Sequence, residues 1–553
     1  MFKKPKFIAI AISLLWLAIL HRPALLSFGN AIPGRVQSDA IRGQWSAWAT
    51  ANDIWGIETH LVNFPEGAAL LPLPPLSLVI VSPMTSLFGA NIGIVSLVML
   101  HAILAIAGGF FLARAVGLSK WPALSCGLFL SAAPMMGEAL SVGVYECLTI
   151  GWSAFCLGAL VKACRGDGWQ WGPAAGILYL LSVIESGYLG SALALSTIVV
   201  SCMFLRSYKG LLSAALAAVV VAAGAWALSV ALAPVLDKFS TESIEAGGFR
   251  VSMGIAELKA IIPGFSPPPP PPGDPEPFRS APPLFVVVFF TGAWIATWRK
   301  SSWAAGLGLA FLLIAIHSSI MSWWIDSPLG EFVKYLRRMA LPMAMMMGLV
   351  IAYGLEWLIE KKPGKQGLQA LVAISGVTLI SSSWGLLTGY PLLWTPVTPQ
   401  FAIDIQEDPM EGALIVVPQE QPEKAQTYNQ NHLSLKKNTS FSNPQARLWF
   451  QTLIDRPVRH HSKLSTLIPK SEGRPLSLDR GVISRQEVES LKEKGLRYLL
   501  LDNEALGRQA LGKAKKTLDQ MGHKCRHYDE WGGIDVCRMD GRIKADPAPS
   551  GGL

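Results

Sequence analysis

The stretch AALLPLPPLSLVIVSPMTSLF, residues 68–88, decides how this chain is threaded through a membrane. It is apolar enough to enter a bilayer, but its four prolines disfavour a single straight helix. If the stretch dips into the membrane with both ends outside, the basic clusters of the later loops face the cytoplasm, as the positive-inside rule requires. If it crosses fully, those clusters face outward, against the three lysines at the N-terminus. The first interpretation is therefore preferred.

The composition of the 553 residues excludes several classes of protein. Only 15% of the residues are charged and 51% are hydrophobic, which argues against a soluble enzyme or a disordered chain. The net charge of +9 is ordinary for a protein whose inner loops are basic, so no nucleic-acid partner is expected. Residues 1–398 hold 42 charged side chains and the much shorter 399–553 hold 43. This asymmetry predicts a membrane domain followed by a soluble one.

The fold class expected is mainly α, with a polytopic transmembrane domain of about 11 helices. A hydrocarbon core about 30 Å thick needs about 20 apolar residues per helix. The predicted spans are residues 7–27, 90–113, 121–137, 143–163, 173–187, 188–205, 211–233, 283–298, 303–323, 339–359 and 367–388. We expect this domain to occupy residues 1–398, with outer loops at 28–89 and 234–282. The first span is interpreted as a retained helix, because no A-x-A cleavage site follows it.

Residues 399–553 are predicted to form a small α/β domain outside the cytoplasm. Short apolar strands alternate with helical stretches, the strands starting at Ala413, Leu496 and Gly533 and one helix at Ser484. An odd number of crossings places the N-terminus in the cytoplasm and this domain in the periplasm. In that compartment Cys525 and Cys537 are candidates for a disulfide. The domain has no catalytic motif, and its histidines lack the spacing of metal ligands to acidic or cysteine partners.

Acidic residues of the membrane domain are concentrated on the predicted outer face. Of the 18 acidic residues before residue 399, only Asp167, Glu356 and Glu360 lie inside under this topology. One interpretation is that outer loops simply tolerate acids. The other is a polar site built on the outer face.

The first outer loop contains the most informative acid. Asp39, Arg42, Trp45 and Trp48 follow a spacing of three residues, so one helix face can present an acid, a cation and two aromatics. One interpretation is an interfacial amphipathic helix with a tryptophan belt. The alternative is that Asp39 acts on a lipid-linked substrate at the water–lipid boundary.

Several short motifs resemble those of the GT-C superfamily of polytopic membrane glycosyltransferases, in particular an uncharacterised bacterial branch. The first span is followed by the outer-loop Asp39 and then by matching pieces, namely NFPEG at 63–67, PLPPLSLVIVSPMTSLFG at 72–89, FFLARAVG at 110–117, LSAAP at 130–134 and YLRRMALPMA at 335–344. The strands ALIVVPQ and GLRYLLLD also resemble those of the outer domain of such proteins. The resemblance covers most of the chain.

The resemblance implies an integral-membrane enzyme of the bacterial inner membrane. It implies inverting transfer of a hexosyl or pentosyl group from a polyprenyl-phosphate donor to an acceptor on the periplasmic face. Asp39 is then the general base, because an acceptor hydroxyl must lose its proton. Arg337 and Arg338 are candidates for the departing lipid phosphate, with Lys334 and Arg42 behind them.

Other roles for these residues stay open. Glu138 and Glu146 are candidates to complete an acidic cluster or hold a divalent cation, although spacing alone indicates no metal site. Arg337 and Arg338 are equally suited to anchoring lipid phosphates. Two further functions also fit the sequence: a non-catalytic protein that binds or transports a lipid-linked precursor, and a scaffold whose outer domain recruits partners.

Overall fold

The computed structural model divides the chain into two compact units. The helical unit comprises Met1–Ala40, Leu73–Ala231 and Gly247–Leu393, and the tail unit comprises Ile41–Pro72, Leu232–Ala246 and Trp394–Leu553. The structure describes residues 5–27, 29–34, 40–52, 58–59, 68–70, 74–240, 300–311, 340–361, scattered positions between 364 and 394, 398–409, 412–417, 450–452, 454, 466–469, 477–530 and 533–539. Parts of both loops that were predicted to be outer thus belong to the same compact unit as the C-terminal residues.

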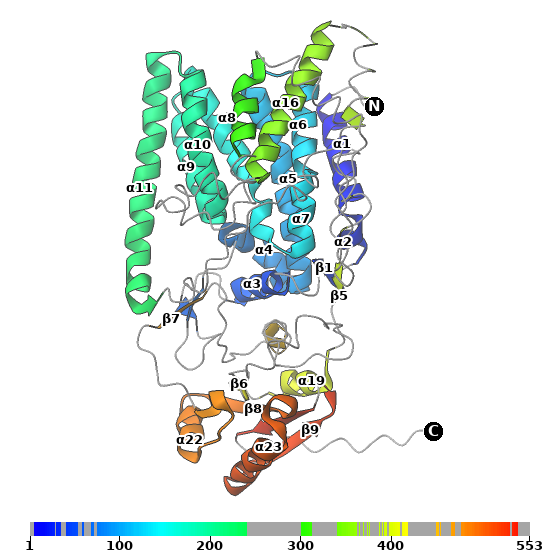
Figure 1. The fold of residues 1–553 in the computed structure, drawn as a ribbon, viewed down its shortest axis with the longest axis vertical. Coiled ribbons are helices and arrows are strands. Elements are labelled where there is room, and N and C mark those ends of the chain that lie inside the picture. The colour runs from blue at the N-terminus through cyan, green and yellow to red at the C-terminus, as the bar shows by residue number, and fades with distance from the viewer. Residues whose placement is uncertain are drawn as a thin grey trace. The chain divides into compact units, whose positions relative to one another are not determined.

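The helical unit is a bundle whose long helices run side by side (Figure 1). Its described elements are α1 (Pro5–Leu20), α2 (Arg22–Leu26), β1 (Ala31–Pro33), α4 (Pro75–Phe88), α5 (Ala90–Ala115), α6 (Lys120–Ser131), α7 (Pro134–Val142), the 3-10 helix η1 (Tyr145–Leu148), α8 (Ile150–Arg165), α9 (Trp171–Glu185), α10 (Gly187–Phe204), α11 (Tyr208–Lys238), α16 (Ala340–Lys361) and β5 (Leu392–Trp394). The strands β1 and β5 pair with each other.

Four of the described helices are long and apolar enough to cross a membrane: Ala90–Ala115, Tyr145–Arg165, Tyr208–Ala233 and Leu341–Lys361. Four shorter apolar helices accompany them: Phe7–Leu20, Pro75–Phe88, Trp171–Glu185 and Ala192–Phe204. These segments make the chain a multi-pass membrane protein and confirm the prediction of a mainly helical fold.

Close glycine contacts hold the centre of the bundle together. A Cβ atom on Gly108 of α5 would lie 2.5 Å from the carbonyl oxygen of Gly151 of α8, and further along Gly158 packs on Leu112. The two helices therefore run parallel with their backbones nearly touching, which is the packing that small residues permit in membranes. Gly127 of α6 makes a similar approach to Ile106 of α5.

Two predicted spans are wrong in detail. The span predicted at 121–137 is two helices, because α6 ends at Ser131 and α7 begins at Pro134, where proline favours a new first turn. The span predicted at 143–163 starts as the 3-10 helix η1 before α8 begins at Ile150. The spans predicted at 283–298 and over most of 367–388 lie outside the described residues.

The tail unit contains a four-stranded mixed sheet in the order β6-β8-β10-β9, formed by Ala413–Val417, Leu496–Asp502, Ile534–Arg538 and Cys525–Tyr528. Strand β6 is parallel to β8, and β10 is antiparallel to both β8 and β9. One face of the sheet packs with α22 (Arg485–Glu493) and α23 (Asn503–Gln520), and the other packs with α19 (Gln400–Glu407). The small α/β domain predicted at the C-terminus is therefore confirmed as a fold.

The tail unit also takes in segments from far earlier in the chain. Helix α3 (Ala40–Asn52) of the first outer loop begins at its boundary. A second sheet, in the order β2-β3-β7-β4, joins Glu58–Thr59 and Ala68–Leu70 of the first loop to Thr466–Pro469 and Phe239–Ser240. Segments from three distant parts of the chain are thus combined in one structural unit.

Candidate functional site

The predicted base, Asp39, lies outside the described residues, but the helix that follows it is well defined. Helix α3 begins at Ala40, joined to Asp39 by one peptide bond, and carries the half-buried Arg42 in its first turn. Trp45 and Trp48 on the same helix are 2% and 7% exposed. Their burial argues against the interpretation of α3 as an interfacial helix with a tryptophan belt, because the protein itself covers both side chains.

The turn at Gly143 holds the start of α3. Gly143 ends α7 with a φ of 67°, and a Cβ atom there would lie 2.3 Å from the backbone nitrogen of Ala40. Any other residue would meet both the unfavourable left-handed conformation and this contact. The backbone nitrogen of Ala40 is consequently packed directly against the turn between α7 and η1.

Two of the predicted acids flank this turn. Glu138 belongs to α7, with a side chain outside the described set, and Glu146 is half-buried in η1. Between them Tyr145 is buried, and its hydroxyl donates a hydrogen bond of 2.6 Å to the carbonyl oxygen of Pro33 in β1. Pro33 and Ala40, which lie on either side of residues 35–39, therefore both contact the region where α7 ends and η1 begins. Glu138 and Glu146 belong to these two helices.

The other predicted cations, Lys334, Arg337 and Arg338, lie outside the described residues. Helix α16, which begins two residues after Arg338, is antiparallel to α6, since Gly348 packs on Phe129 and Glu356 accepts from Ser119. Its first residues are thus at the end of α6 where α7 begins, and α16 packs against α7. The chain enters α16 at the same end of the bundle as the Gly143 turn.

The opposite end of the bundle is basic. Arg165, at the end of α8, donates hydrogen bonds of 2.6 and 3.2 Å to two carbonyl oxygens. These belong to Ala115, the last residue of α5, and to Val116, which follows it. The ammonium of Lys162 lies 4.6 Å from the ring centroid of Trp171. Cations at helix C-termini satisfy unpaired carbonyls and favour the helix dipole. Acids of the Gly143 turn and these cations therefore occupy opposite ends of the same helices.

A buried acid, Glu185 at the end of α9, serves a different purpose. Its carboxylate accepts hydrogen bonds from the backbone N–H and the hydroxyl of Ser77, at 2.8 and 2.6 Å. Ser77 is the third residue of α4, so Glu185 neutralises the N-terminus of that helix. Glu185 is therefore a structural residue that fixes α4 to α9.

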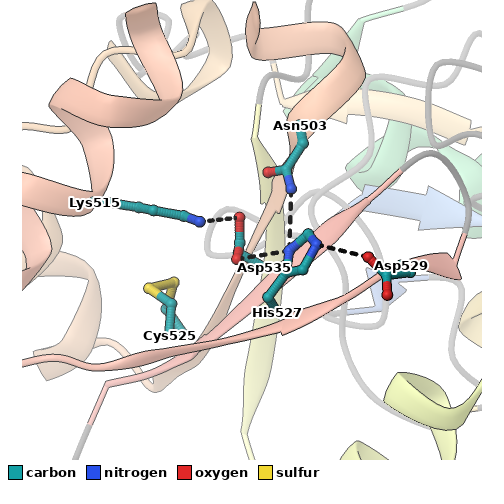
Figure 2. A network of polar contacts seen from close by, with 7 residues as sticks. Asn503, Lys515, Cys525, His527, Asp529 and Asp535 are labelled. Atoms are coloured by element: carbon teal, nitrogen blue, oxygen red, sulfur yellow. Dashed lines mark hydrogen bonds and ion pairs between the residues drawn. A yellow bond between two sulfur atoms is a disulfide. The ribbon is translucent and has the colours of Figure 1, made fainter. Parts of the chain in front are cut away.

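The tail unit contains a polar network that the sequence did not indicate (Figure 2). Asp535 of β10 is buried, with Oδ1 3.1 Å from Nδ1 of His527 and Oδ2 2.8 Å from Nζ of Lys515. Nε2 of His527 lies 3.2 Å from Asp529. The spacing of residues along the chain gave no sign of this contact, because it is the pairing of β9 with β10 that places residue 527 directly opposite residue 535.

Two residues further along the same strands, Cys525 and Cys537 are joined by a disulfide. The network beside this disulfide consists of the ion pair between Lys515 and Asp535 and of a histidine that lies between two carboxylates. Among the residues that the structure describes, no group of three or more histidine, cysteine or acidic side chains is placed to hold a metal ion.

The fold of the chain is similar to that of solved GT-C glycosyltransferases. No known protein family matches the sequence, and no curated protein is significantly similar to it. The chain is similar in structure to the arabinofuranosyltransferase AftD from mycobacteria, with a TM-score of 0.52 and 13% sequence identity over 96% of this chain. It spans about two fifths of the length of that protein, since the match covers 40% of AftD.

Two other solved structures are similar over most of the chain. ArnT from Cupriavidus metallidurans matches with a TM-score of 0.49 and 11% identity, over 96% of this chain and 99% of its own, and has been solved with undecaprenyl phosphate bound. The oligosaccharyltransferase of Archaeoglobus fulgidus matches with a TM-score of 0.47 and 12% identity, over 90% of this chain and 70% of its own. The likeness to AftD, over nearly the whole chain, establishes the fold.

Proposed function

We propose that this protein is an integral-membrane glycosyltransferase that moves a sugar from a polyprenyl-phosphate donor to an acceptor on the outer face of a membrane. The observation that carries the proposal is the likeness of the fold to AftD over 96% of the chain. Because one fold can host unrelated functions, the site must supply the rest of the case. The Gly143 turn supports it, since the turn gathers the acid-bearing segments at one end of the bundle.

The charge of the two ends supports an orientation for this site. Arg114, Lys162 and Arg165 lie at the end of the bundle opposite the Gly143 turn. Under the positive-inside rule the basic end is cytoplasmic, so the turn and the first loop face the periplasm. A disulfide between Cys525 and Cys537 suits the same oxidising compartment.

The proposed chemistry assigns each group one task. The carboxylate of Asp39 takes the proton of the acceptor hydroxyl as its oxygen forms the new bond to the anomeric carbon. The bond from that carbon to the phosphate oxygen breaks, and the polyprenyl phosphate leaves with the bonding electrons. Arg337 and Arg338 stabilise the charge that develops on the phosphate, with Lys334 and Arg42 contributing to the same field.

The decisive experiment replaces the proposed base without changing its shape. We expect Asp39→Asn to lower transfer from radiolabelled polyprenyl-phosphate pentose or hexose by at least about 100-fold, the usual contribution of a general base. The matched control is Asp53→Asn, the same substitution in the same loop, which should retain activity. Assays would use the full chain in membranes with cell-envelope extract as acceptor, and immunoblots would verify equal amounts of protein.

Full transfer by Asp39→Asn would exclude Asp39 as the base. If the wild-type chain transfers none of the sugars but moves labelled lipid across proteoliposomes, the protein is a lipid-linked precursor transporter instead. These outcomes separate the two functions because only the enzyme forms a new glycosidic bond.

A further inference from the structure

The first outer loop is bonded to the C-terminal part of the chain through a buried tryptophan. The indole N–H of Trp45 donates a 2.9 Å hydrogen bond to Oε1 of Gln451, across 406 residues of sequence. Both side chains are buried, at 2% and 0% exposure. A buried donor and acceptor that meet in this way are costly to separate, because neither can turn to water instead.

Gln451 is in turn fixed by its neighbour in the chain. Phe450 is buried in the core that covers one face of the β6-β8-β10-β9 sheet, with its ring 5.5 Å from that of Phe401 in α19. The position of the Gln451 amide is therefore set by the packing of the tail sheet.

The same loop is attached to the tail unit a second time. Strand β3 of the first loop pairs antiparallel with β7, with Ala69 opposite Leu467 and Leu70 opposite Thr466. Because α3 and β3 lie at either end of residues 40–70, the loop is held by the tail at both points.

Helix α3 needs such support. It has 13 residues, a length at which isolated helices are marginal in water, and its side chains from Gln44 to Thr50 are all buried. Its start is packed against Gly143, directly after Asp39. A shift of α3 would therefore move the segment that carries the proposed base.

We propose that the tail positions the catalytic loop, with Gln451 and Trp45 as positioning residues for the transfer reaction. The inference rests on the proposed function, because it assigns α3 the task of aiming Asp39. Neither residue contacts the reacting atoms. They act by fixing α3, which also carries Arg42, so their loss should reduce turnover more than it reduces affinity for the donor.

The test is a double-mutant cycle in the full chain, with Trp45→Phe and Gln451→Leu singly and together. Hydrogen exchange over residues 40–52, measured without substrate, should increase in each single variant and no further in the double variant. The kcat for the radiolabelled polyprenyl-phosphate sugar should fall by about 10- to 100-fold, with a smaller change in KM, as expected for a misplaced catalytic group. Gln509→Leu, the same substitution at an exposed site of α23, should change neither quantity.

The outcomes separate the inference from the function on which it rests. Unchanged exchange over 40–52 in both single variants would overturn the link between tail and loop, whatever the enzyme does. Increased exchange with unchanged kcat, in a protein that Asp39→Asn inactivates, would overturn the positioning role alone. Full activity of Asp39→Asn would instead remove the proposed base, and the positioning role with it.

Discussion

Glu185 in the helical unit and Asp535 in the tail unit are both buried carboxylates, but they are stabilised by different kinds of partner. Glu185 is 0% exposed and is bonded to a serine hydroxyl and a backbone N–H at a helix N-terminus. Asp535 is 1% exposed and is paired with a lysine and a histidine. Burial alone therefore does not say what a carboxylate does, because the partners decide it.

The difference follows from the surroundings of each group. Within a membrane bundle no water can compensate an unpaired group, so a carboxylate is satisfied most readily by oriented dipoles of the protein. At the edge of the tail sheet Lys515 and His527 are 39% and 49% exposed, so solvent reaches the partners although it does not reach Asp535. We expect the first interaction to resist salt and the second to depend on it.

The largest effect is expected for Glu185→Ala. The substitution leaves the N–H and the hydroxyl of Ser77 without their acceptor, at a cost of about 3 kcal/mol in unfolding free energy. Thermal unfolding of the detergent-purified chain, followed by size-exclusion chromatography, should show a clearly lower midpoint. Glu360→Gln is the control, because its exposed pair with Lys300 is worth little. Equal midpoints for the two variants would mean that Glu185 does not hold α4.

A slightly smaller effect is expected when the disulfide beside Asp535 is removed. Replacing Cys525 and Cys537 by serine frees a loop closed over 12 residues, worth about 2–3 kcal/mol of tail stability. Limited proteolysis of the full chain should then cut the tail faster, while the helical unit remains protected. In the native chain, mass spectrometry without reduction should find the two cysteines linked. Free thiols on both would contradict the pairing and weaken the periplasmic placement.

The smallest of the three effects is expected for Asp535→Asn. It removes the carboxylate partner of Lys515 and leaves His527 with Asp529 alone, but both side chains can turn partly to water, so about 1–2 kcal/mol is lost. Proteolysis at low and high salt should show the deficit shrinking as salt rises. Asp529→Asn, the control, alters the exposed partner of the same histidine and should have no measurable effect. If Asp535→Asn accelerated proteolysis of the tail as much at high salt as at low salt, the contrast with Glu185 would fail.

Sequence patterns predicted the parts of this protein that depend on local composition. The spans starting at 90, 211 and 339 correspond to α5, α11 and α16 within a few residues, because long apolar runs have few alternatives to a membrane helix. Ser484 was correctly placed at the start of a tail helix, and it precedes α22. The roles of Asp39, Arg337 and Arg338 remain predictions, since these residues lie outside the described part of the chain.

Other features could not be predicted because they depend on residues distant in sequence. Trp45 and Trp48 have the spacing of an interfacial face, yet the protein buries them. His527 has no metal-ligand spacing, yet strand pairing sets it opposite Asp535. The helix break before Pro134 had a local signal in the proline itself, which the run of apolar residues obscured.

The sequence by itself determined that this is a membrane protein of many helices with a small α/β domain at its end, because scarce charge and long apolar runs allow little else. Only the tertiary structure decided that the first loop and the tail share one unit. The bond between Trp45 and Gln451 joins residues 406 positions apart. No local pattern encodes such a partner, because the energy of a buried hydrogen bond depends on where the rest of the chain has packed.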